Sequence, residues 1–70
     1  MKTFTKRSMV GTLGRVTIDH ITSNRKWTTR DVLMLVDADG RTLSNAQFRT
    51  NAFKQAESFF LSEGWEVKEN

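Results

Sequence analysis

The chain has 70 residues, 37% of them hydrophobic, and a net charge of +3. This length fits one domain, residues 1–70. Folding of so short a chain buries only about 60% of the surface that the unfolded chain exposes, so the core is thin. The sequence has no cysteine and one histidine, His20, which excludes disulfides, thiolate metal sites and the usual multi-histidine zinc sites.

The charge is unevenly distributed along the chain. Residues 1–30 contain seven basic side chains and one acidic, whereas residues 31–70 contain four basic and seven acidic. A basic half attracts polyanions or an acidic protein surface. Chance partition of surface charge in a short chain is the alternative explanation.

No apolar run approaches the roughly 20 residues that a membrane-spanning helix needs. The basic residues Lys2, Lys6 and Arg7 precede no apolar stretch, which argues against a secretory signal. We therefore expect a cytoplasmic protein that does not bind membranes.

Two strands are predicted in the first half of the chain. Residues 9–22 are rich in β-branched side chains and alternate in polarity, which indicates a strand with a bulge or bend at Gly11 and Gly14. After a polar turn at 23–26, residues 27–37 predict a second strand. A capping-box pattern at 28–31 gives a short helix as the alternative, but the run is short and β-branched, which favours the strand.

A turn, a helix and a last strand are predicted in the second half. The sequence Asp-Ala-Asp-Gly at 37–40 is typical of a turn, because a calcium loop needs further acidic ligands that are missing here. Arg41–Leu43 is a candidate short strand, and Ser44 is a candidate N-cap for a helix over 45–62. Gly64 suits the C-cap of that helix, and residues 65–67 predict a final strand.

These elements predict an α+β fold, with a small antiparallel sheet of three to four strands and one helix packed on one face. Strand alternation places Leu33 and Leu35 on one flank of the second strand, in register with Trp27, and Val32, Met34 and Val36 on the other. One helix covers one flank. The flank with Leu33 and Leu35 is therefore expected to need another cover: the N-terminal segment, a second copy in a homodimer, or a partner protein.

The sequence gives little support to catalysis. His20 has only Asp19 and Asp31 as candidate acid–base partners, and no serine lies in a nucleophile motif. Gly11-Thr12-Leu13-Gly14, followed by Arg15, has the spacing of a nucleic-acid clamp loop, but its extended surroundings favour a bulge. We expect no enzyme, no cofactor and no metal.

The best local candidate for contact is Arg25-Lys26-Trp27 with Arg30. At a hairpin tip, an indole can stack on a base while neighbouring cations hold phosphates. The same residue types are common in protein–protein hot spots. A packed tryptophan beside solvated charges is the structural alternative.

The layout of strands, helix and strand, with Ala52, Ala56 and the closing Gly64-Trp65-Glu66-Val67, resembles small phage-encoded proteins that inhibit host machinery, anti-CRISPR proteins among them. The resemblance implies a stoichiometric inhibitor, in the host cytoplasm, that blocks a nucleic-acid-handling complex. The net basic charge of the chain argues against mimicry of nucleic acid.

Two functions are therefore expected from the sequence. The first is an inhibitor or adaptor that docks on a protein of a nucleic-acid-handling complex. The second is a small basic nucleic-acid-binding protein. The expected protein-docking residues are Trp27, Leu33, Leu35, Arg25, Lys26 and Arg30. The expected nucleic-acid-binding residues are Arg15, Arg25, Lys26, Trp27 and Arg30.

Overall fold

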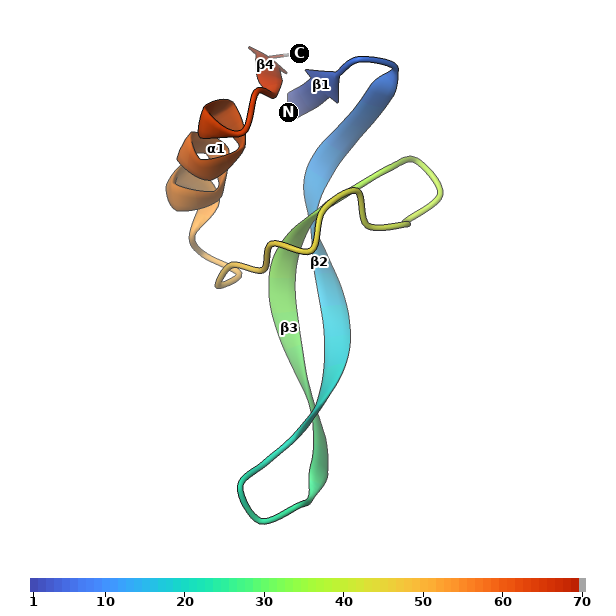
Figure 1. Cartoon of the computed structure of the whole chain (residues 1–70), viewed down its shortest axis with the longest axis vertical. Helices are drawn as coiled ribbons and strands as arrows, with labels where there is room; N and C mark the ends of the chain where they lie inside the picture. Colours follow the sequence, from blue (N-terminus) through green and yellow to red (C-terminus); the bar gives the residue numbers. More distant parts are fainter. Residues whose placement is uncertain (70) are drawn as a thin grey trace.

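The computed structural model of the chain describes residues 1–69. Within this range the elements are β1 (Lys2–Lys6), β2 (Met9–Ile21), β3 (Trp27–Val36), α1 (Phe53–Ser62) and β4 (Glu66–Glu69). All neighbouring strands are antiparallel, in the order β3-β2-β1-β4 (Figure 1). The predicted α+β class is confirmed. The helix that these residues form lacks the length and hydropathy needed to span a bilayer.

Strand β2 changes its partner between Gly11 and Thr12. Residues 9–11 pair with β1, whereas residues 12–21 pair with β3 in an uninterrupted register. The prediction was a bulge or bend at Gly11 and Gly14. The continuous pairing of residues 12–21 leaves no bulge at Gly14, whereas the change of partner occurs at Gly11. At Gly11 the backbone of β2 lies close to the backbone of β3. A Cβ atom at this position would lie 2.7 Å from the carbonyl oxygen of Val36, so a larger residue does not fit there.

The core lies between α1 and one face of the sheet. Phe60 is central to it, with its ring edge-on to Phe4 at 5.9 Å and to Trp65 at 6.2 Å between centroids. Edge-on pairs of this kind contribute about 0.5–1.5 kcal/mol beyond the burial of their area. The buried members of the core are Phe4, Leu33, Leu35, Ala56, Phe60 and Trp65.

The helix packs on the flank that bears Leu33 and Leu35, and these leucines have no exposed surface. The expectation that the flank with Leu33 and Leu35 is uncovered by the helix is therefore wrong. The N-terminal segment forms β1 and contributes Phe4 to the same core. On the opposite flank, Val32 and Met34 are buried as well. The reason for expecting a homodimer is removed with the uncovered flank.

The helix begins at Phe53, so the first part of the helix predicted over 45–62 is wrong. Its N-cap position is Ala52, which provides no side-chain hydrogen bond. The hydroxyl of Ser44 instead accepts a local hydrogen bond from the backbone N–H of Ala46 at 3.2 Å. Serine and asparagine favour such local bonds over a helix interior.

Residues 43–48 instead run along the outer edge of β3. The backbone N–H of Leu43 donates to the carbonyl of Leu35 at 2.7 Å. Phe48 and Leu33 exchange two backbone hydrogen bonds, of 3.0 and 2.7 Å. These hydrogen bonds satisfy backbone N–H and C=O groups on the outer edge of β3 next to the core. The backbone groups on the outer edge of residues 27–32 take no part in this pairing.

Asp37 organises the predicted turn, since its Oδ1 accepts hydrogen bonds from the backbone N–H groups of Asp39 and Arg41, both at 2.9 Å. The candidate strand Arg41–Leu43 is only an isolated bridge between Val36 and Thr42. The turn is confirmed and the short strand is wrong.

Gly64 ends the helix as predicted, with a φ of 94°. The backbone N–H of Trp65 donates to the carbonyl of Phe60 at 3.0 Å, and that of Gly64 donates to Leu61 at 3.2 Å. This is the Schellman pattern, in which a left-handed glycine follows the last helical turn. It returns the chain to the sheet, where β4 pairs with β1.

Candidate functional site

The outer part of the β2–β3 hairpin projects from the body of the molecule (Figure 1). We call residues 15–31 the hairpin arm. The molecule measures 42 × 23 × 19 Å. Its radius of gyration of 13.2 Å exceeds the value of about 11 Å expected for a compact chain of this length. A two-stranded ribbon is only marginally stable by itself in water, so the arm depends on the continuation of β2 and β3 into the body of the sheet.

The turn at the tip is defined by three hydrogen bonds around Thr22. Its backbone N–H donates to the carbonyl of Lys26 at 2.9 Å, and its carbonyl accepts from Arg25 at 2.9 Å. Its hydroxyl accepts from the backbone N–H of Lys26 at 3.3 Å. This is a three-residue hairpin loop, a common type that ends in one left-handed residue.

Arg25 occupies that left-handed position, with a φ of 59°. The conformation costs a residue other than glycine about 1–2 kcal/mol. Glycine or asparagine is the usual choice at such a position. Arg7, between β1 and β2, has the same left-handed conformation with a φ of 57°, so this feature belongs to hairpin turns of the chain and does not by itself distinguish the tip.

The last residue pair before the turn is Ile21 and Trp27. Both side chains are exposed, Ile21 by 54% and Trp27 by 72%. Arg25 and Lys26, which lie next to this pair in the turn, are also exposed. The tip therefore combines an apolar surface with two cations.

The four arm cations of the expected nucleic-acid set, Arg15, Arg25, Lys26 and Arg30, are all exposed. Within residues 1–69 none of them forms an ion pair. The arm also contains two acidic residues, Asp19 and Asp31, so it carries a net positive charge. One oxygen of Asp31 accepts a hydrogen bond from the hydroxyl of Thr17 across the ladder, at 2.9 Å.

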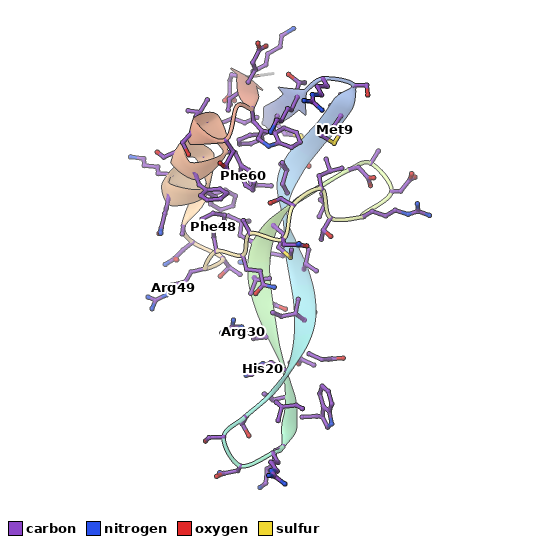
Figure 2. The ribbon with its side chains drawn as sticks, in the orientation of Figure 1. Met9, His20, Arg30, Phe48, Arg49 and Phe60 are labelled. Carbon is purple, nitrogen blue, oxygen red and sulfur yellow. The ribbon has the colours of Figure 1, made fainter. Side chains whose placement is uncertain are left out.

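The arm cations do not share one flank. The register places Arg15 on the same flank as Trp27, whereas Arg30 lies on the other flank with His20. In the view of Figure 2, Arg30 and His20 both lie to the left of the arm. His20 is thereby on the opposite flank from Asp19 and Asp31, its candidate acid–base partners.

The two leucines of the expected protein-docking set are not on this surface. Leu33 and Leu35 are fully buried in the core, so their assignment to a docking site is wrong. The other four members, Trp27, Arg25, Lys26 and Arg30, are exposed on the arm.

No family model, curated protein or solved structure matches this chain. The resemblance to phage-encoded inhibitors therefore stays an expectation from the sequence. Function has to be argued from the arm itself.

Sequence reasoning missed two residues next to the arm. Ile21 was placed in the first strand, and only the register shows it opposite Trp27 at the tip. Arg49 was placed inside the predicted helix, whereas the structure places it after the bridge between Phe48 and Leu33, near Arg30. A signal for the second was present, because Thr50 and Asn51 are poor helix formers.

Proposed function

We propose that this chain is a non-enzymatic protein that binds nucleic acid with its hairpin arm. The observation that carries the proposal is Trp27, exposed by 72% at the tip of the arm and adjacent to the cations Arg25 and Lys26. Every residue of the expected nucleic-acid set is exposed on this one element.

The exposed indole supports a stacking role. Burying a tryptophan removes about 150–250 Å² of surface from water, at roughly 25 cal/mol per Å². The fold leaves most of this stabilisation unused at Trp27, while Trp65 is buried in the core. On a single strand, stacking of an unpaired base on the indole provides about 1–3 kcal/mol. In a duplex the bases stay stacked on one another, and the indole is expected to contact base edges and thymine methyl groups in the major groove.

The distribution of cations supports a duplex as the ligand. A two-stranded β-ribbon fits the major groove of B-form DNA, where side chains of the ribbon reach base edges and cations around it reach phosphates on both strands. Arg15 on one flank and Arg30 on the other suit this arrangement. Arg25 and Lys26 add positive charge at the leading end of the ribbon.

The test is the binding of labelled duplex and single-stranded oligonucleotides, followed by fluorescence anisotropy over a series of salt concentrations. Four phosphate contacts on a duplex predict a slope of about −3.6 in log affinity against log salt. Lys26→Ala is expected to reduce the steepness of that slope by about 0.9. Lys54→Ala, which removes an exposed cation from the helix, is the matched control and should not change it. If neither the duplex nor the single-stranded oligonucleotide binds at low salt, the proposal is overturned.

A second candidate is an inhibitor or adaptor that docks on a protein of a nucleic-acid-handling complex. It is favoured by the exposed apolar pair of Ile21 and Trp27 beside Arg25, since tryptophan and arginine are enriched in interface hot spots. In this case Trp27→Ala abolishes binding to the partner, Lys26→Ala has little effect, and affinity changes little with salt. The resemblance to phage-encoded inhibitors fits this candidate.

A further inference from the structure

A hollow of about 200 Å³ lies where the hairpin arm joins the body. Arg30 comes from the arm, and Arg49 comes from the segment that precedes the helix. In the view of Figure 2, both arginines lie to the left of the β2–β3 hairpin, and the side chain of Arg49 extends away from it. The residues that line the hollow are Arg30, Asp31, Val32, Gln47, Phe48 and Arg49.

The backbone fixes the position of Arg49. The two hydrogen bonds between Phe48 and Leu33, at 2.7 and 3.0 Å, hold this segment against the edge of β3. The ring of Phe48 packs edge-on against Phe60 of the core, at 5.9 Å between centroids. Arg49 therefore follows an anchored residue and does not belong to a free loop.

The positive charge at the hollow is only partly offset by the chain. Within residues 1–69, neither Arg30 nor Arg49 forms an ion pair. Asp31 also lines the hollow, so its charged lining residues are two arginines and one aspartate. One oxygen of Asp31 accepts the hydrogen bond from Thr17, which belongs to the opposite flank from Arg30. Two arginines that line one hollow provide positive charge that favours the binding of an anion there.

We infer that this hollow binds one phosphate group through Arg30 and Arg49. Guanidinium groups present paired N–H donors that match phosphate oxygens, so two of them form a strong and geometrically selective site. The inference rests on the proposed function in naming the source of the phosphate, which is the backbone of the nucleic acid bound by the arm. Free phosphate has the same chemistry and is separated from it by experiment.

The first experiment uses the full chain and a labelled duplex over a salt series, with Arg49→Ala compared with Arg41→Ala. Arg41 is an exposed arginine in the 37–41 turn and does not line the hollow. Arg49→Ala removes one of the two groups on the phosphate, so it is expected to weaken binding and to reduce the steepness of the salt slope by up to about 0.9, whereas Arg41→Ala should leave both unchanged. Arg49→Lys retains the charge without the paired donors and should recover only part of the affinity. Unfolding of each variant by urea shows whether the fold is intact.

The second experiment adds inorganic phosphate to the chain and follows the guanidinium Nε–H signals of Arg30 and Arg49 by NMR. Saturable shifts of both signals, absent for Arg41, support the site whether or not an oligonucleotide binds. If the duplex binds but Arg49→Ala behaves as Arg41→Ala does, the inference is overturned and the proposed function stands. If phosphate shifts both signals and no oligonucleotide binds, the hollow is a site for free phosphate and the proposed function is overturned.

Discussion

Trp27 lies directly opposite Ile21 in the last residue pair of the β2–β3 ladder, and both side chains remain exposed to solvent. Cross-strand pairs of an aromatic and a β-branched residue typically contribute about 0.2–1 kcal/mol to a sheet. This pair stabilises the end of the arm to that extent, but it leaves most of the apolar area of both side chains available to a ligand.

Replacement of Trp27 by alanine is therefore expected to leave the fold nearly unchanged. We predict a loss of less than about 1 kcal/mol in the free energy of unfolding, because only the cross-strand contact is removed. Trp65→Ala, in the buried core, is expected to cost about 3–5 kcal/mol. Urea denaturation of the two variants makes the comparison. A similar loss in both would mean that Trp27 is a structural residue.

Arg25→Gly is expected to stabilise the chain by about 1 kcal/mol, because glycine adopts the left-handed conformation at this position without strain. The matched control is Lys26→Gly, next in the same turn, where φ is not positive and glycine only adds freedom to the unfolded chain. Thermal unfolding should give Arg25→Gly a higher Tm than the native chain and Lys26→Gly a lower one. A destabilised Arg25→Gly contradicts the strained geometry of the turn. The same variant should bind the oligonucleotide more weakly.

Gly11→Ala is expected to cost more than about 2 kcal/mol. The new Cβ would lie 2.6 Å from Cδ1 of Leu43 and 2.7 Å from the carbonyl oxygen of Val36, and the latter cannot move without disturbing β3. Gly14→Ala is the control, because its nearest contact is a methyl group of Val36 at 3.2 Å. We expect a change of less than about 1 kcal/mol there. Equal losses of unfolding free energy would contradict the close approach at Gly11.

Leu35→Asp is expected to unfold the chain, since it places an unpaired carboxylate in the core. Leu35→Ala retains the fold with a loss of about 2–5 kcal/mol. Circular dichroism and urea denaturation measure both. A folded Leu35→Asp variant of native stability would contradict the burial of this side chain.

Much of the fold was predictable because local signals agreed with the final structure. The β-branched residues around Val16 and Ile18 gave the long strand, and Gly64 gave the end of the helix. The N-terminal strand was missed because Lys2–Lys6 has only one buried apolar residue, Phe4, and no turn signal other than Arg7 and Ser8. The start of the helix was misplaced because Phe48 fits a helical spacing but pairs instead with Leu33.

The candidate site was predictable only in part. The cluster at Trp27 was visible because tryptophan and basic residues are adjacent in the sequence. The flank of β3 that the helix covers could not be predicted, because β3 carries apolar residues on both faces. Alternation alone does not distinguish the two faces. The contribution of Arg49 depends on a long-range backbone bridge, which no local pattern specifies.

The most direct test of whether the hairpin arm binds nucleic acid uses the intrinsic fluorescence of Trp27. The sequence has two tryptophans, and Trp65 is buried, so quenching on addition of a duplex oligonucleotide at low salt reports on Trp27. We predict quenching with weaker affinity as salt is added, and the loss of quenching in Trp27→Phe. Unchanged emission at saturating oligonucleotide, or equal quenching in Trp27→Phe, would contradict the claim that the arm binds nucleic acid through this residue.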